Sequence, residues 1–240
     1  MTNRVLLNNI DHRTLRVITR RSAEFGDNIN QALVFPTEFE ELQREYPIFF
    51  RRDASGDFQS VVLLGLDRDE NLFLDETGWQ ARYIPAVQER GPFLIGFHKQ
   101  TDEARNEPMI HVDLDHPRIS RTEGEPVFMP HGGNSPYLNG IAQTLKSIHQ
   151  GTELARPMFA ALEAEGLIEP VAVEIALDDT TRYKLPGLHT IGADRLAQLG
   201  AAGLERLHKA GFLHLAFCVV MSLGNVSRLI DMKNKKRATS

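Results

Sequence analysis

The densest group of side chains that could perform chemistry lies in residues 110–117. There the chain reads Ile-His-Val-Asp-Leu-Asp-His-Pro, and alternation along a strand would place His111, Asp113 and Asp115 on one face, with His116 just beyond. Two imidazoles and a carboxylate can form the facial triad of a non-haem iron site. His111, Asp113 and His116 are therefore candidate metal ligands.

A zinc site is possible if either His98 or His131 joins this group, because zinc favours four ligands rich in histidine and cysteine. The same alternation describes the solvent face of an ordinary antiparallel strand, and Asp115-His116-Pro117 resembles a turn. The sequence leaves these interpretations open. We predict no cofactor, with iron or zinc as the alternative.

A second candidate site contains Trp79, Arg82 and Tyr83, which follow a predicted hairpin. Aromatic rings beside a guanidinium group are typical of surfaces that bind a small molecule or a peptide. Such residues also close the edge of a β-rich core. Both interpretations are open, and these three residues are the candidate ligand-binding residues.

Nucleophile motifs are missing from the sequence. It contains no Gly-x-Ser-x-Gly, and Ser222 lies within an apolar helical stretch. The single cysteine, Cys218, has apolar neighbours and no adjacent charged group, so we expect it in the core. We lean toward a protein without catalytic activity, and no catalytic residue is assigned.

Composition limits the class of protein. The 240 residues are 42% hydrophobic, with 27 basic and 32 acidic side chains and a formal net charge of −5, which is typical of a globular, water-soluble chain and gives no drive toward nucleic acid. The longest apolar run, residues 212–223, is shorter than the roughly 20 residues that cross a bilayer. We expect no membrane span and no secretory signal. Cytoplasmic residence is the default, and association with the envelope by a signal-less route remains open.

The elements that must position these residues fall into two patterns. Up to residue 125, short apolar runs such as 58–66 and 109–114 predict an antiparallel or mixed sheet, and Thr37 with Glu40 is typical of a capping box on one short helix. From Ser135 and Pro136, a helical start signal, apolar residues recur at helical spacing, with a break or bend expected at Gly151.

The remainder of the chain predicts a hairpin over residues 171–185 and two closing helices, over 193–210 and 212–234. Strands followed by helices, a hairpin and further helices predict an α+β fold. No linker separates the halves, so we expect one domain over residues 1–240, with a β-rich subregion at 1–125 and a mainly helical one at 126–240.

Several segments together resemble the SapC family of bacterial proteins. The resemblance is carried by Tyr-Pro-Ile-Phe-Phe-Arg-Arg-Asp at 46–53, Val-Val-Leu-Leu-Gly-Leu at 61–66, Ser-Pro-Tyr-Leu at 135–138 and Gly-Leu-His-Thr-Ile at 187–191, with Ser-Leu-Gly-Asn from Ser222. It spans roughly residues 30–232. It implies association with a bacterial surface layer and transfers no catalytic residue. The peptide-transport permease of the same name is a different, membrane-spanning protein.

Three functions therefore remain. The first is a non-catalytic binding or assembly protein of the SapC type, acting on a protein partner or on copies of itself, with surface-layer or envelope association implied by the resemblance. The second is a metal-dependent enzyme or accessory using His111, Asp113 and His116. The third is a small-molecule or peptide sensor with a pocket between the β-rich half and the helices.

Overall fold

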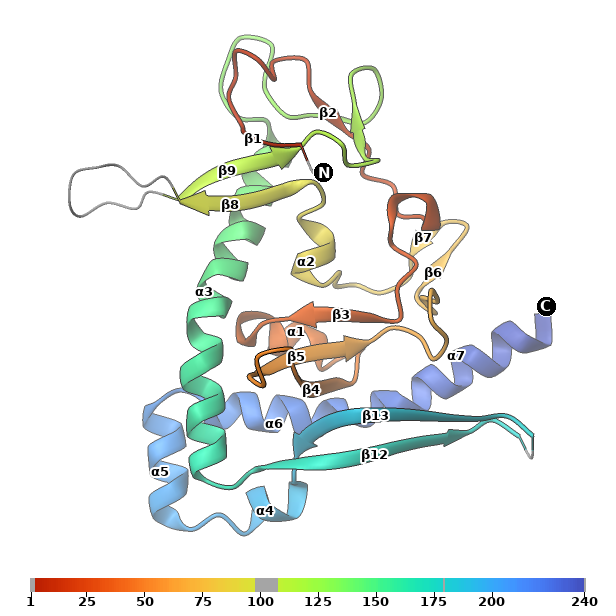
Figure 1. Cartoon of the computed structure of the whole chain (residues 1–240), viewed down its shortest axis with the longest axis vertical. Helices are drawn as coiled ribbons and strands as arrows, with labels where there is room; N and C mark the ends of the chain where they lie inside the picture. The colour runs from red at the N-terminus through yellow and green to blue at the C-terminus, as the bar shows by residue number, and fades with distance from the viewer. Residues whose placement is uncertain (1–2, 98–107, 179, 240) are drawn as a thin grey trace.

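The computed structural model describes residues 3–97, 108–178 and 180–239. Strands dominate the first half of the chain, and helices with one long hairpin make up most of the second, which confirms the predicted α+β class (Figure 1).

The largest sheet has five antiparallel strands in the order β12-β13-β4-β5-β3. These strands are β3 (Gln31–Val34), β4 (Ile48–Arg52), β5 (Phe58–Leu63), β12 (Ile168–Ala176) and β13 (Arg182–Ile191). β13 joins β4 through two register pairs, Leu188 with Arg51 and His189 with Phe50. Strands from both halves of the chain therefore share one sheet.

A second sheet has the order β1-β9-β8 and carries the candidate metal ligands. Its strands are β1 (Arg4–Leu6), β8 (Phe93–Phe97) and β9 (Pro108–Asp113). Beside it are very short strands and helical turns: β2 (Arg16–Val17), η1 (Ala23–Phe25), η2 (Pro36–Glu38), α1 (Phe39–Leu42), β6 (Leu74–Asp75), β7 (Gly78–Trp79), α2 (Ala86–Glu89), β10 (Ile119–Ser120) and β11 (Glu125–Pro126).

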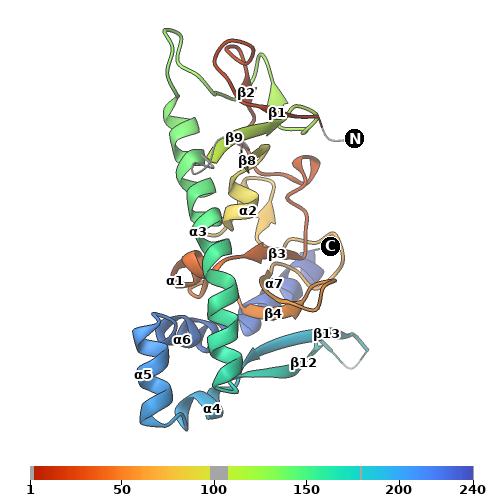
Figure 2. The same ribbon diagram turned by 60° about the vertical axis from the view of Figure 1, so that its left-hand side comes forward.

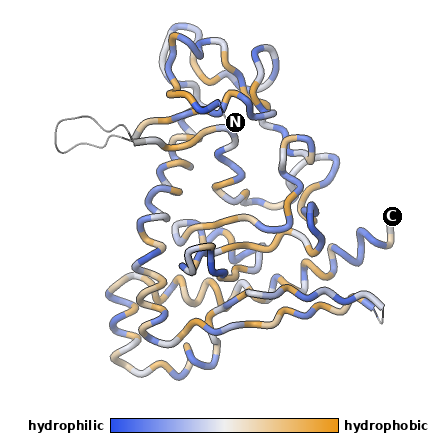
Figure 3. Tube along the Cα trace, in the orientation of Figure 1, coloured by the Kyte–Doolittle hydropathy of each residue, from blue (hydrophilic) through white to orange (hydrophobic). Residues whose placement is uncertain are grey.

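The long helix α3 (Pro136–Ala164) runs from the β8–β9 hairpin to the β12–β13 hairpin (Figures 1 and 2). Its start is the predicted one, because Ser135 Oγ accepts the backbone N–H of Leu138 at 3.1 Å and Pro136 occupies the first turn. Hydrophobic and hydrophilic residues alternate at short intervals along it, as an amphipathic helix requires (Figure 3).

The break expected in α3 at Gly151 is wrong, because the helix is continuous through that position. Instead, Gly151 permits close packing. A Cβ there would collide with the Phe35 side chain and lie 2.7 Å from Thr37 Oγ1. The missing side chain therefore lets α3 pass directly against η2.

Two clusters of buried apolar side chains hold these elements, and α3 contributes to both. The small cluster joins the second sheet to the first half of α3, and it contains Leu15, Val17, Phe93, Val112, Val127, Phe128, Leu138, Ile141 and Leu145. The large cluster lies between the five-stranded sheet, the second half of α3 and the closing helices, with Phe49, Phe50, Val62, Phe159 and Val219 among its members.

Four helices close the chain: α4 (Ala193–Ala197), α5 (Ala201–Lys209), α6 (Leu213–Ser222) and α7 (Asn225–Thr239). Each of the two predicted closing segments thus contains two helices, since the chain interrupts them around Gly200 and Gly224. Cys218 lies buried on α6, and burial raises the pKa of its thiol. On α7, Lys233 is buried and pairs with Glu70 at 2.8 Å, which fastens the last helix to the loop after β5.

By length and composition alone, the helical stretch Leu213–Ala238 could cross a membrane. About a third of its most apolar part, 33%, is buried within the fold. Core helices of water-soluble proteins meet the same criterion, so the expectation of no membrane span stays a prediction.

Candidate functional site

The predicted alternation in the 110–117 segment holds for its first two polar residues. His111 and Asp113 both lie on β9, where they face Leu6 and Arg4 of β1 in register. The His111 ring occupies the space that a Cβ at Gly96 would need, and its Nδ1 is buried without a hydrogen-bond partner among the described residues.

The structure brings Asp113 and His116 to one pocket, and His111 is not among the residues that line it. Within residues 3–97, 108–178 and 180–239, no group of three or more His, Cys, Asp or Glu side chains could hold a metal ion. His98 lies outside the described residues. The iron or zinc site therefore stays a prediction.

The predicted ligand surface at residues 79–83 makes its polar contacts within the fold. Trp79 Nε1 donates to Tyr46 Oη at 2.8 Å, and Tyr46 Oη in turn donates to the Tyr83 carbonyl oxygen at 2.6 Å. Tyr83 Oη donates to Glu38 Oε2 at 3.0 Å. Arg82 is exposed, and its backbone N–H donates to a carboxylate at 2.8 Å.

Both rings of this predicted surface also pack against the large cluster. None of the three residues lines the pocket that holds Asp113 and His116. Their role in binding a ligand stays a prediction, although the hydrogen bonds favour the interpretation that these rings close the edge of the core.

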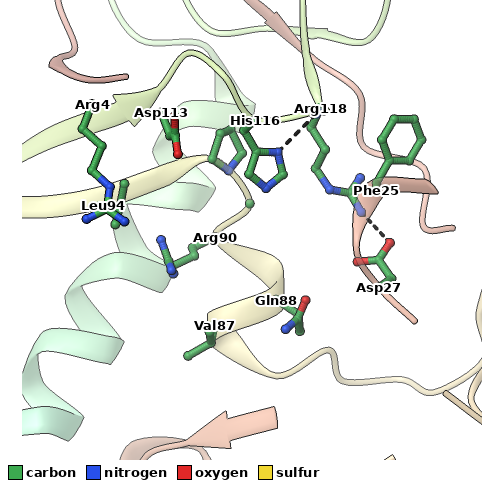
Figure 4. A pocket seen from close by; sticks show the side chains of 12 residues that line it. Arg4, Phe25, Asp27, Val87, Gln88, Arg90, Leu94, Asp113, His116 and Arg118 are labelled. Carbon is green, nitrogen blue, oxygen red and sulfur yellow. Dashed lines mark hydrogen bonds and ion pairs between the residues drawn. The ribbon is translucent and has the colours of Figure 1, made fainter. Parts of the chain in front are cut away.

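The pocket that holds Asp113 and His116, the polar pocket, has a volume of about 220 Å³. It lies between α2, the second sheet and the segment around η1 (Figure 4). It is lined by Arg4, Phe25, Asp27, Val87, Gln88, Arg90, Gly91, Pro92, Leu94, Asp113, His116 and Arg118.

Arg118 forms one wall of the polar pocket, and its guanidinium binds other residues of the fold. Its guanidinium donates to the carbonyl oxygens of Ile18 at 2.9 Å and Arg20 at 2.7 Å, and it pairs with the buried carboxylate of Asp27. It also lies 5.0 Å from the centre of the Phe25 ring. This buried pair is internally neutral, so Arg118 and Asp27 act as a rigid support.

His116 presents one ring nitrogen to the pocket. Its Nδ1 accepts the backbone N–H of Arg118 at 3.2 Å, which assigns the proton of the neutral ring to Nε2. Burial lowers the pKa of His116 below its usual range, and the charges of Arg118 and Arg90 lower it further, whereas Asp113 and Asp27 oppose them. At neutral pH the ring is therefore a neutral N–H donor.

Arg4 and Arg90 are the cations of the pocket without a carboxylate partner. Neither forms an ion pair with the described residues, and Arg90 Nη1 donates only to the Phe93 carbonyl oxygen, at 2.6 Å. Burial lowers the pKa of the Arg90 guanidinium, and the neighbouring charge of Arg4 adds to this effect. Figure 4 shows both side chains near Leu94, on the side of the pocket away from Asp27.

The pocket can therefore hold an anion. Its charged groups are three guanidiniums and two carboxylates, and with the Arg118–Asp27 pair neutralised, Arg4 and Arg90 outweigh Asp113 by one positive charge. Guanidinium groups bind carboxylates through planar paired hydrogen bonds, and a buried cation without a partner gains from one.

Sequence reasoning found Asp113 and His116 but missed both arginines. Arg4 reaches the pocket because β1 pairs with β9, which places it opposite Asp113. Arg90 arrives from the turn after α2. No spacing motif joins positions so distant in the chain, so only tertiary pairing could reveal them.

A family model described as SapC matches residues 7–229 of the chain. No curated protein and no solved structure matches it.

Proposed function

The chain belongs to the SapC family, and from its polar pocket we propose that it is a non-catalytic binding protein for a small organic anion held by Arg4, Arg90 and His116. The observation that carries the proposal is the convergence of two guanidiniums without carboxylate partners on one pocket. Arg90 is half-buried, and a cation that is partly removed from water gains from a ligand that supplies the negative charge.

The geometry gives each of the three residues a separate role. Arg90, half-buried beside the pocket wall, supplies the paired donors, and Arg4 closes over the ligand from β1. His116 donates from Nε2. Asp113 disfavours a ligand of high negative charge, which makes a carboxylate a better fit than a dianion.

Acetate is the simplest probe of this proposal, with binding followed by NMR chemical shifts. We expect Arg4→Met and Arg90→Met each to weaken acetate binding at least ten-fold. Arg44→Met, a change at an exposed arginine in the turn after α1, is the matched control and should leave binding unchanged. Arg4 is exposed, so its variant should fold even if the Arg90 variant does not.

Acetate binding should also strengthen as the pH falls below 6.5, over the range in which acetate keeps its charge, because protonation of His116 adds a positive charge beside the ligand. A wild-type protein that binds no acetate, or acetate binding that survives both arginine substitutions, would refute the proposal. Recovery of unchanged ligand after long incubation tests the non-catalytic part.

Surface-layer or envelope association is a second candidate function, which family membership suggests. Phe217 is 47% exposed and Met221 is 70% exposed, and they lie one turn apart on α6. Exposed apolar pairs of this kind favour contact with a partner or a second copy of the chain. Fractionation of native cells tests it: the protein should accompany the envelope, Phe217→Ser with Met221→Ser should release it, and a wholly soluble pool would contradict it.

A further inference from the structure

A second cavity, which we name the apolar groove, adjoins the polar pocket. Three residues, Val87, Arg90 and Leu94, line both. The apolar groove has a volume of about 360 Å³ and lies between β8, the middle of α3 and the end of β3. The two cavities are therefore neighbours that meet at Arg90.

Aliphatic and aromatic side chains make up most of the wall of the apolar groove. Leu33 and Phe35 contribute from the β3 side, and Leu145 and Ile148 contribute from α3. Arg90, His149 and Thr152 are the polar residues of its lining, whereas charged side chains line much of the polar pocket. The two cavities therefore offer opposite chemistry on either side of Arg90.

Leu33 indicates that the apolar groove is left open by the fold. It is 36% exposed on β3, an edge strand, whereas its neighbours Ala32 and Val34 are buried at 3% and 2%. Close packing of α3 against η2, which Gly151 permits, fixes the facing wall. A partly exposed apolar side chain that lines a cavity gains from contact with an apolar ligand.

We propose, resting on the proposed function, that the ligand is an aliphatic carboxylate whose head binds in the polar pocket and whose hydrocarbon chain lies in the apolar groove. Charge complementarity at Arg4 and Arg90 selects the head, and the apolar groove next to Arg90 selects the tail. A carboxylate without a chain would fill only the first cavity, and an apolar molecule without a charge only the second.

Calorimetric titration with octanoate, acetate and 1-octanol separates these cases. We expect octanoate to bind at least ten-fold more tightly than either, because it alone uses both cavities. Leu33→Ser should weaken octanoate at least three-fold and leave acetate unchanged. Leu154→Ser is the matched control, because Leu154 is another exposed leucine, at 40%, on α3 and outside the apolar groove. It should change neither affinity.

The outcomes also distinguish this inference from the proposed function. Equal affinities for acetate and octanoate, both reduced by Arg4→Met, would overturn the aliphatic tail and support the anion pocket. Binding of 1-octanol as tight as that of octanoate would overturn the requirement for a charged head. Octyl phosphate binding more tightly than octanoate would overturn the carboxylate head. Failure of every probe to bind would overturn both.

Discussion

The hydroxyl of Ser222 forms a hydrogen bond between α6 and β4 of the five-stranded sheet. Ser222 is fully buried, accepts the backbone N–H of Ile48 at 2.9 Å and donates to the Val219 carbonyl oxygen at 2.6 Å. Sequence reasoning placed it correctly in an apolar helical stretch. It could not show the partner at Ile48, which is far away in the chain.

Replacing Ser222 by alanine leaves the Ile48 N–H buried without an acceptor. We expect the free energy of unfolding to fall by about 1–3 kcal/mol, the desolvation cost of such a group. Urea denaturation measures the change. Ser227→Ala, at an exposed position on α7, is the control and should be nearly neutral. If Ser222→Ala left the free energy of unfolding unchanged, the hydrogen bond would make no net contribution to stability.

Glu38 is the second residue with a measurable consequence. It is 2% exposed, and its carboxylate accepts from the backbone N–H groups of Phe35 and Ala86, both at 2.9 Å. The predicted capping box on Thr37 and Glu40 does not form, because a 3-10 turn starts at Pro36 and Glu38 takes the capping role. Thr37 instead donates to the Ser147 carbonyl oxygen of α3 at 3.1 Å.

Burial raises the pKa of Glu38 above its ordinary value of 4.5, although its three hydrogen bonds oppose this. A folded state that holds a proton more tightly than the unfolded chain loses stability as the pH rises through the folded pKa. The unfolding free energy of the wild type relative to Glu38→Gln should therefore fall as the pH rises above about 4.5.

Urea titrations at a series of pH values measure this difference for Glu38. Glu76→Gln, which removes an exposed carboxylate from the β6–β7 turn, controls for the loss of one negative charge. If the unfolding free energy of the wild type relative to Glu38→Gln rose with rising pH, the prediction would be contradicted.

Among the elements, α3 contains two glycines in different surroundings. Gly151 lies against η2, whereas a Cβ at Gly140 would meet nothing within 4 Å. The sequence predicted a helix here, and its amphipathic period was correct. The interpretation of Gly151 as a helix break was wrong. A single sequence does not distinguish a glycine that permits close packing of a helix from a glycine that ends one.

Alanine at the two glycines of α3 should have opposite effects. Gly140→Ala should stabilise the protein by about 0.5–1 kcal/mol, the helix-propensity difference. Gly151→Ala should destabilise it, because the collision with Phe35 forces α3 away from η2. Urea denaturation of the two variants provides the comparison. If both variants were more stable than the wild type, η2 would be able to move away from α3 at little cost.

At the scale of the whole molecule, α3 joins the two apolar clusters that the chain builds. The sequence predicted one domain with subregions divided at residue 125. This division stays a prediction, and strands of both halves share one sheet, in which β12 and β13 join β3, β4 and β5. Sequence patterns identify the apolar segments, but their assignment to clusters depends on long-range strand pairing.

Because α3 belongs to both clusters, we expect them to unfold together. Val112→Ala, in the fully buried centre of the small cluster, should lower stability by about 1.5 kcal/mol or more, at about 0.8 kcal/mol for each buried carbon group removed. Trp79, the single tryptophan, packs against the large cluster and reports on it by fluorescence.

The denaturation midpoints of Val112→Ala, measured by Trp79 fluorescence and by far-ultraviolet circular dichroism, should therefore shift together. Val5→Ala, at a partly buried position of the same cluster, should shift both midpoints less. A fluorescence midpoint that stays at its wild-type position would show two independently unfolding units.

The burial of Cys218 gives this molecule a natural reporter of local opening. It is the only cysteine of the chain, and at 5% exposure a thiol reagent cannot reach it while α6 is docked. The labelling rate of the native protein therefore follows how often α6 separates from its neighbours, without any engineered label. If a partner slowed the labelling of Cys218, that partner would reduce how often α6 separates from the rest of the fold.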